Sequence, residues 1–181
     1  GVDFEHTGLV RKIDATGIRR AVDFGALVML SPFGFSPTGE AFNLSMEDVA
    51  ASAADALQAD KLIYVTEVKG IPLDPTDPSS EIDTELALAD AKRLLANLPN
   101  PVQPTDTAFY LQHAVKACEA GVERVHIVPF SVDGSVLMES FTHDGVGTMI
   151  VDEKLESLRE ATADDIGGIL QLIEPFEKNG T

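Results

Sequence analysis

The chain has 181 residues, of which 44% are hydrophobic and 24% are charged, a composition typical of a globular domain with one sizeable core. Aspartate and glutamate number 30 against 13 lysines and arginines, and the formal net charge of −17 disfavours nucleic acid and anionic membranes as partners. No apolar run is long enough to span a membrane, and the single cysteine, Cys118, excludes a disulfide framework, so we expect a cytoplasmic protein with a small cationic or zwitterionic ligand.

The first third of the chain alternates short apolar runs with a capped helix. Leu9–Ile13 is a predicted strand, after which Asp14 caps a helix that ends at Gly25. Ala26–Leu30 is the next predicted strand. The loop Ser31–Glu40, rich in Ser, Pro and Gly, would follow the carboxyl end of that strand, where open α/β sheets bind ligands.

The middle of the chain repeats this alternation. Ser45 begins a capping box, which predicts a helix over Met46–Leu57. Lys61–Val65 is a short β-branched run that predicts an interior strand. Two more helices are predicted, over Glu81–Leu98 and Thr107–Ala120. The pattern favours an α/β fold in which a parallel-rich sheet carries helices on its faces.

The run from Gly121 to Val151 organises the rest of the chain, and it reads GVERVHIVPFSVDGSVLMESFTHDGVGTMIV. It predicts a buried strand over Arg124–Val128, a short helix that Gly134 opens, a glycine-broken loop and a last strand over Thr148–Val151. We interpret this run as the wall of a small-molecule site.

Two side chains and two glycines in this run could form the site. Glu139 would turn toward His126, and Gly145 and Gly147 permit positive φ and close approach, so their loop could present free amides beside the carboxylate. The alternative is that His126 is a hydrogen-bonded core histidine, Glu139 a solvated helix residue and the glycines a plain turn, because a lone G-x-G is weak evidence. Three apolar side chains of the helix are predicted to face the core: Val136, Leu137 and Phe141.

Three stretches of the chain together resemble a known family. They are SPFGFSPTGEAFNLSMEDVA (31–50), DTAFYLQHAVKACEAGVERVH (106–126) and ERVHIVPFSVDGSVLMESFTHDGVGTMI (123–150). They resemble the C-terminal half of the amino-acid kinase (carbamate kinase-like) fold, as it occurs in N-acetylglutamate synthases and N-acetylglutamate kinases. The resemblance covers nearly the whole chain. It implies a three-layer, parallel-rich sheet with helices on both faces, truncated because the N-terminal half of the kinase-like domain lies upstream of Gly1 in those relatives.

The same resemblance divides the chain into three parts. Residues 1–151 correspond to the C-terminal part of an amino-acid-kinase-like regulatory domain, 152–158 to a charged linker and 159–181 to the beginning of a GNAT acetyltransferase domain. The acetyl-CoA loop of that class does not appear before Thr181. We therefore expect no catalytic residue and no cofactor in this chain, with acetyl-CoA and L-glutamate as substrates of the parent enzyme.

One missing charge separates the two members of the family. In the kinases, a lysine near the start of the helix that leads to the last strand holds the transferring phosphate, whereas this chain has no lysine or arginine between Arg93 and Lys116. Phosphoryl transfer needs cations aimed at the developing negative charge. The resemblance therefore favours a synthase, which acetylates L-glutamate in the first step of arginine biosynthesis, with N-acetylglutamate kinase as the alternative.

In the synthases, the kinase-like domain binds L-arginine as a feedback effector and builds a homo-oligomer. The resemblance assigns the arginine contacts to His126, Glu139 and Gly145. We expect Glu139→Ala to weaken binding strongly, because a charge-assisted hydrogen bond is lost. We expect little loss of stability, because Glu139 is predicted to lie on a helix face where truncation costs little. Asn43 matches a position that contacts the acyl-amino-acid in kinase relatives, although an asparagine can equally order its own loop. No metal ligand is expected. An assembly module with a degenerate pocket is a third hypothesis.

Overall fold

A four-stranded mixed sheet forms the centre of the computed structural model, which describes residues 6–74, 77, 80–98, 105–141 and 145–152. Its strand order is β3-β7-β8-β6, where β3 is Lys61–Thr66, β7 is Arg124–Pro129, β8 is Thr148–Val151 and β6 is Glu85–Ala87. The outer pairs, β3–β7 and β6–β8, are parallel, and the central pair β7–β8 is antiparallel. The predictions of a parallel-rich sheet and of its β3, β7 and β8 strands are confirmed.

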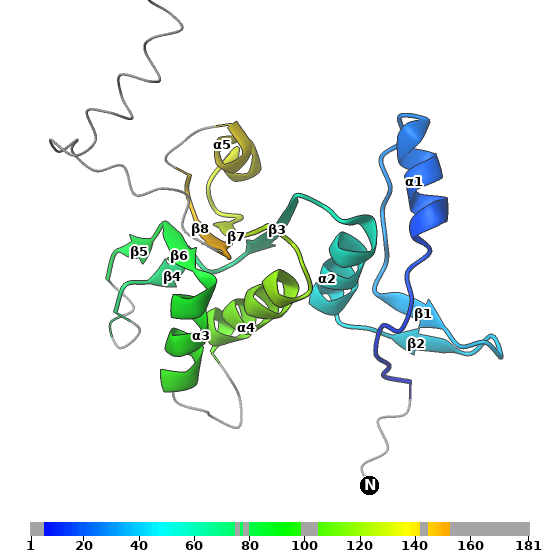
Figure 1. The fold of residues 1–181 in the computed structure, drawn as a ribbon, viewed down its shortest axis with the longest axis horizontal. Helices are drawn as coiled ribbons and strands as arrows, with labels where there is room; N and C mark the ends of the chain where they lie inside the picture. The colour runs from blue at the N-terminus through cyan, green and yellow to red at the C-terminus, as the bar shows by residue number, and fades with distance from the viewer. Residues whose placement is uncertain (1–5, 75–76, 78–79, 99–104, 142–144, 153–181) are drawn as a thin grey trace, which may run out of the picture.

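Helices cover both faces of this sheet (Figure 1). On one face lie α2 (Met46–Leu57), α3 (Leu88–Asn97) and α4 (Asp106–Glu119), with α4 contacting β7 and β8 and packing between the other two helices. On the other face lies the short α5 (Ser135–Phe141), which packs on β7. The predicted three-layer α/β arrangement is therefore confirmed.

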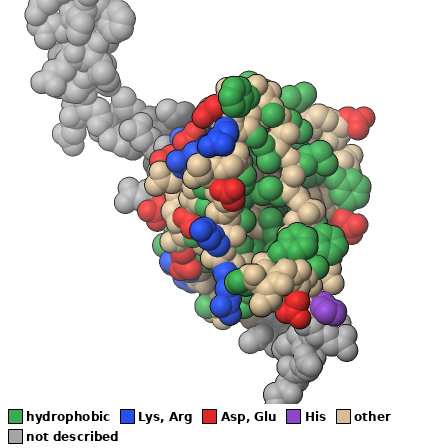
Figure 2. Space-filling model, turned by 90° about the vertical axis from the view of Figure 1, so that its right-hand side faces the viewer, with side chains coloured by type: hydrophobic (Ala, Val, Ile, Leu, Met, Phe, Trp, Pro, Cys, Tyr) green, Lys and Arg blue, Asp and Glu red, His purple; other side chains and the backbone are tan. Residues whose placement is uncertain are grey.

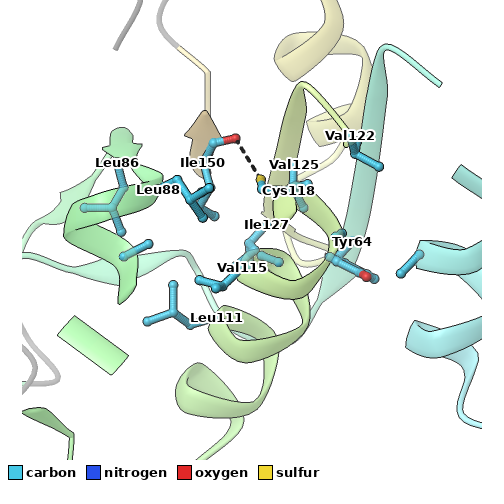
Figure 3. Packing of buried hydrophobic residues seen from close by; sticks show 14 of the residues in the cluster. Tyr64, Leu86, Leu88, Leu111, Val115, Cys118, Val122, Val125, Ile127 and Ile150 are labelled. Atoms are coloured by element: carbon cyan, nitrogen blue, oxygen red, sulfur yellow. Dashed lines mark hydrogen bonds between the residues drawn. The ribbon is translucent and has the colours of Figure 1, made fainter. Parts of the chain in front are cut away.

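Alternate side chains of β7 point to opposite faces of the sheet: Val125 and Ile127 toward α4, and His126 toward α5. Val125 and Ile127, both fully buried, pack into a cluster with Leu111 and Cys118 of α4 (Figure 3). The Cys118 thiol donates to the carbonyl of Ile150 at 3.8 Å, and burial together with nearby acidic groups raises its pKa to about 11. The prediction of a packed core thiol is confirmed. All residues of β7 after Arg124 are buried, because both sides of the sheet are covered, and the strand therefore shows no regular alternation of buried and exposed residues.

Local sequence signals predicted the start of α2 correctly but not the start of α3. The Ser45 hydroxyl accepts from the amide of Asp48, and α2 has the predicted bounds. The predicted helix over Glu81–Leu98 is wrong up to Ala87, because Ile82–Asp83 forms β5 against β4 (Ile71–Pro72) and β6 pairs with β8. Leu86 is thereby only 6% exposed. Tertiary pairing overrides the helical spacing of this segment.

The N-terminal arm, residues 6–44, stands on the far side of α2 from the sheet (Figure 1). Its helix α1 (Ala15–Asp23) has the predicted cap, since the Asp14 carboxylate accepts from the Gly17 amide at 3.0 Å. The predicted strands over 9–13 and 26–30 are wrong, because neither segment pairs with another strand among the described residues. An extended segment becomes a strand only when a neighbour binds its backbone.

The predicted ligand loop over 31–40 belongs instead to a hairpin of the arm. Strand β1 (Phe33–Phe35) pairs antiparallel with β2 (Ala41–Asn43), so the segment does not follow a strand of the central sheet. The alternating apolar residues at 33, 35 and 42 are compatible with a hairpin. This segment therefore does not form the predicted ligand loop at a sheet edge.

Candidate functional site

A buried histidine and a buried carboxylate face each other between β7 and α5. His126 Nδ1 lies 2.8 Å from Glu139 Oε1, and the two side chains are 4% and 5% exposed. Because an ionised carboxylate only accepts hydrogen bonds, Nδ1 carries the proton and donates. The reading of Glu139 as a solvated helix residue is wrong, while His126 is indeed a hydrogen-bonded, buried histidine.

Two backbone amides complete the surroundings of the carboxylate. Val146 N donates to Glu139 Oε2 at 2.8 Å, and Gly147 N donates to the same oxygen at 3.3 Å. The glycine loop lies beside this carboxylate as predicted, but the expectation of free amides is wrong for Val146 and Gly147, because both donate to Glu139 Oε2. An ionised carboxylate has about four acceptor positions. Three are used by the protein itself, which leaves the carboxylate able to accept from one further donor.

This loop needs glycines at 145 and 147 because its backbone lies very close to Glu139 and to β7. A Cβ at Gly145 would lie 2.6 Å from Glu139 Oε2, and a Cβ at Gly147 would lie 2.1 Å from the carbonyl oxygen of Ile127. Any larger residue would push the loop away from the carboxylate and from β7. The expectation of positive φ is wrong for Gly147, whose backbone lies outside the left-handed region.

Helix α5 is turned the opposite way from the prediction. Ser135 and Glu139, one helical turn apart, are its buried residues. The predicted core-facing residues Val136, Leu137 and Phe141 are 41%, 64% and 84% exposed. The polar side of the helix faces inward because the carboxylate finds three donors there, which compensates its desolvation. The expected small effect of Glu139→Ala on stability is revised accordingly.

The electrostatics of the pair keep the carboxylate ionised. Burial by itself raises the pKa of Glu139, but the hydrogen bonds from His126, Val146 and Gly147 outweigh burial, and the pKa lies below its ordinary value. Nε2 of His126 is buried and has no hydrogen-bond partner among the described residues. The site therefore holds a buried negative charge and one buried ring nitrogen without a hydrogen-bond partner among the described residues.

Asn43 lies apart from this pair. It ends β2 in the N-terminal arm, on the other side of α2 from α5 (Figure 1). The backbone amide of Asn43 donates to the His6 carbonyl at 2.7 Å, and its backbone carbonyl accepts from the Gly8 amide at 2.9 Å. The structure thus brings His126, Glu139 and Gly145 together but not Asn43, whose contact with an acyl-amino-acid stays a prediction.

A buried threonine beside the site was not singled out by the sequence. The Thr148 hydroxyl, at the start of β8, accepts from the Ile71 amide at 2.8 Å and donates to the Asp83 carbonyl at 2.6 Å. It fastens the β4–β5 hairpin to the central sheet. The signal was a hydroxyl within an otherwise apolar strand, TMIV, but its partners are more than sixty residues away in sequence.

A polar contact between α2 and α4 was also missed. Lys116 Nζ lies 2.6 Å from Asp48 Oδ1, and His113 Nδ1 lies 3.8 Å from the same oxygen. The N-terminus of α4 is capped by the Thr105 hydroxyl, and Asp106 occupies its first turn. Lys116, the single lysine of α4, is therefore engaged by an acid, and the first turn of the helix contains no lysine or arginine.

Two structural features bear on membrane and metal-dependent functions. In the part of the chain that the structure describes, no helix has both the length and the apolar character that a membrane crossing requires. Among those same residues, His, Cys, Asp and Glu side chains form no cluster of three or more suited to a metal ion. Among the described residues, His126 and Glu139 form a buried acid–base pair 2.8 Å apart.

The mixed sheet between helical layers, with a buried carboxylate held by a glycine loop, defines a three-layer α/β domain. The family comparison agrees with this class. The chain belongs to the amino acid kinase family, whose model matches residues 1–129. The resemblance drawn from the sequence motifs is therefore confirmed.

Curated relatives narrow the comparison. The amino-acid acetyltransferase of Ralstonia nicotianae is 56% identical over 181 residues, which are 100% of this chain and 39% of that protein. The amino-acid acetyltransferase of Pseudomonas paraeruginosa is 46% identical over 180 residues, which are 99% of this chain and 40% of that protein. The chain thus spans about two-fifths of the length of the curated relatives it matches.

Solved structures give the same answer at the level of the fold. A crystal structure of N-acetylglutamate synthase from Neisseria gonorrhoeae, complexed with coenzyme A and L-arginine, matches with a TM-score of 0.78 at 38% identity, over 97% of this chain and 39% of that chain. Carbamate kinase from Giardia lamblia bound to AMP-PNP matches with a TM-score of 0.60 at 16% identity, over 78% of this chain and 45% of that chain. The second likeness concerns the fold alone.

Proposed function

We propose that this chain is the kinase-like regulatory part of an N-acetylglutamate synthase, an amino-acid acetyltransferase that transfers the acetyl group of acetyl-CoA to L-glutamate. The 56% identity to the Ralstonia nicotianae amino-acid acetyltransferase supports this proposal. Residues 152–158 as a linker and 159–181 as the start of an acetyltransferase domain remain predictions, since residues 153–181 lie outside the described part of the structure. Acetyl transfer is assigned to the rest of the parent protein.

The ligand proposed for the domain itself is L-arginine, bound at His126, Glu139 and Gly145. The observation that carries the proposal is the buried, ionised Glu139 carboxylate, which keeps one acceptor position beside a glycine loop. A guanidinium or ammonium group that donates to such a carboxylate contributes roughly 1.5–3 kcal/mol. The Neisseria gonorrhoeae synthase, which is 38% identical, was solved in complex with L-arginine, which supports L-arginine as the ligand.

The geometry refines how arginine would bind. A guanidinium fork makes two parallel hydrogen bonds to a carboxylate only when both oxygens have a free acceptor position on the same side. The amides of Val146 and Gly147 already donate to Oε2. In the closed arrangement, arginine would therefore donate a single hydrogen bond to Glu139, and a second would require the glycine loop to move.

Phosphoryl transfer is disfavoured by the described charges. The sequence has no lysine or arginine between Arg93 and Lys116, and Lys116 is paired with Asp48. We expect the parent protein to release no ADP from ATP in the presence of N-acetylglutamate. A turnover in the ordinary kinase range, about 1 to 100 per second, would show that the kinase alternative is right.

Calorimetric titration of the parent protein with L-arginine tests the ligand assignment. Glu139→Gln keeps the size and one acceptor oxygen of the side chain but removes its charge, and we expect arginine affinity to fall about tenfold to a hundredfold. Citrulline, a neutral ligand of similar shape, is the matched control and should bind the wild type weakly. Circular dichroism of the variant checks that the fold is retained.

Two outcomes would reverse the proposal. Unchanged arginine affinity in Glu139→Gln would remove Glu139 from the binding site. Absence of arginine binding in the wild type would favour the assembly module with a degenerate pocket, for which sedimentation of the parent protein would then give the oligomeric state. Acetyl transfer to glutamate, measured as release of coenzyme A, tests the activity of the parent independently of arginine.

A further inference from the structure

Two polar side chains of the central sheet each keep a buried atom that has no hydrogen-bond partner among the described residues. The atoms are His126 Nε2, already described, and Glu85 Oε1. Charged side chains normally lie in water, as they do at the surface of the face shown in Figure 2. A buried polar atom without a partner is unfavourable, and native proteins retain few of them. Both atoms are therefore candidates for contact with a ligand.

The strand register places these two residues in one row across the sheet. Met149 of β8 is paired with His126 of β7 on one side and with Glu85 of β6 on the other. Residues paired in this way point to the same face, and two strand spacings separate the outer members of the row by about 10 Å. Glu139 reaches His126 on this face from α5. The second carboxylate thus lies on the same side of the sheet as the candidate site.

The described helices leave part of this face uncovered. Helix α5 packs on β7, while α2, α3 and α4 lie on the opposite face (Figure 1). Met149, which lies between the two polar residues, is only partly buried, whereas the next residue, Ile150, points to the opposite face and is fully buried. A ligand held at Glu139 could therefore extend over Met149 toward Glu85.

The two atoms without a partner are both acceptors. Because Nδ1 of His126 donates to Glu139, the Nε2 atom of the neutral imidazole carries a lone pair. Glu85 Oε1 belongs to a carboxylate, which only accepts hydrogen bonds when it is ionised. The row therefore has an acidic side chain at each end and an apolar side chain between them. This arrangement fits a ligand with two cationic donor groups joined by an aliphatic stem.

We propose that Glu85 is a second acidic residue of the ligand site, which binds the α-ammonium group of L-arginine while the guanidinium donates to Glu139. The inference rests on the proposed function and adds the orientation of the ligand. The aliphatic stem lies on Met149, whose flexible thioether adapts to irregular contacts. Glu85 is thereby a specificity-determining residue, because it selects a ligand that carries an α-amino group.

Calorimetric titration of the parent protein with two ligands tests this orientation. The second ligand, 5-guanidinopentanoate, is arginine without its α-amino group. The wild type should bind L-arginine about tenfold to a hundredfold more tightly than 5-guanidinopentanoate, because one charge-assisted hydrogen bond is lost. Glu85→Gln should weaken L-arginine by the same factor and change the affinity for 5-guanidinopentanoate by less than about twofold. An equal loss for both ligands, or no loss for L-arginine, would overturn the proposal.

The matched control is Glu81→Gln, which removes the same charge from an exposed residue of the neighbouring chain. It should change neither affinity by more than about twofold, because solvent and salt screen an exposed charge. Glutamine keeps the size of glutamate, and circular dichroism checks that both variants fold. Equal affinity of the wild type for the two ligands would overturn the role of Glu85 without any variant.

Glu139→Gln separates this inference from the proposed function. It should weaken both ligands, since both carry the guanidinium group that donates to Glu139. A loss in Glu139→Gln without a loss in Glu85→Gln would overturn the role of Glu85 and leave the arginine site standing. Absence of L-arginine binding to the wild type would overturn both.

Discussion

Two apolar runs of similar composition differ in this molecule, since one is a buried strand and the other is exposed and unpaired among the described residues. RVHIVP in β7 is flanked by β3 and β8, covered by α4 and α5, and contains fully buried Val125 and Ile127. ALVML at residues 26–30 belongs to the N-terminal arm and exposes Leu27 and Met29 almost completely. Both runs have the composition of an interior strand. Their difference teaches that composition sets the tendency to form a strand, while the neighbouring chain decides whether the strand forms.

The candidate site lies in the first of these two regions. His126 comes from the buried run, and Glu139 reaches it from a helix that packs on β7. The sheet therefore positions both members of the pair, since β7 is one of its strands and α5 packs on that strand. The arm, in contrast, packs on α2 through α1 and, among the described residues, not directly on the sheet. Its position relative to the site therefore depends on α2. Stability measurements on matched variants therefore separate the two regions.

The largest expected difference is between two leucines. Leu111 in α4 is fully buried, whereas Leu27 in the arm is 89% exposed. Leu111→Ala should lower the free energy of unfolding by about 2–5 kcal/mol, because it removes buried apolar surface and leaves a cavity. Leu27→Ala should change it by less than about 0.5 kcal/mol. Urea denaturation of the 181-residue chain measures both, and similar values would contradict the contrast between sheet and arm.

The second-largest expected difference is between the stability costs of alanine substitutions at one glycine from each region. At Gly147, a Cβ would meet the carbonyl oxygen of Ile127 at 2.1 Å, and that carbonyl belongs to the rigid β7. Gly147→Ala should cost about 1–3 kcal/mol or more through overpacking. At Gly25 in the arm, φ is +78° and no atom lies within 4 Å of the added carbon.

For Gly25→Ala, we expect only the backbone cost of the left-handed conformation, about 1–2 kcal/mol. Thermal unfolding of the two variants followed by circular dichroism makes the comparison. A Gly147→Ala protein that is more stable than Gly25→Ala would mean that the glycine loop does not pack on β7 as described.

Removal of Glu139 should destabilise the sheet region at neutral pH. Glu139→Ala leaves the imidazole of His126 and the amides of Val146 and Gly147 without their acceptor, which costs roughly 1–3 kcal/mol. The pKa of Glu139 is lower in the folded protein than its ordinary value of 4.5. The ionised carboxylate therefore contributes stability above that pH, and the contribution is lost as pH falls through the folded pKa.

The test is a pair of denaturation series, wild type and Glu139→Ala, from neutral pH to below 4.5. The difference between the two proteins should be full at neutral pH and should narrow in the acidic range. A difference that stays constant across that range would show that the charge of Glu139 is not what stabilises the fold.

The smallest effect is expected between α2 and α4. Lys116 is 63% exposed at its side chain, and its ion pair with Asp48 is therefore screened by solvent. Lys116→Met keeps most of the apolar stem and should cost about 0.2–1 kcal/mol. Because salt screens exposed pairs, the difference should shrink further at high ionic strength. An effect as large as that of Leu111→Ala would mean that this pair, and not the apolar cluster, holds the helices together.

Local signals in the sequence determined several elements of the structure. The Ser45 cap and the alanine-rich run after it specified α2, and the Asp14 cap specified α1, because a capping side chain binds amides within its own first turn. The glycine loop beside Glu139 was also foreseen, since glycine spacing shows where the backbone can come close. These features depend on residues that are neighbours in the chain.

Other features were decided only by contacts between distant segments. Helix α3 starts at Leu88 and not at the predicted Glu81, because β6 pairs with β8, whose residues lie about sixty positions further along the chain. The inward turn of α5 likewise depends on where His126 and the amides of Val146 and Gly147 stand in space. Hydrophobic periodicity alone placed Val136, Leu137 and Phe141 inside, because it takes no account of a buried carboxylate whose hydrogen bonds compensate its desolvation.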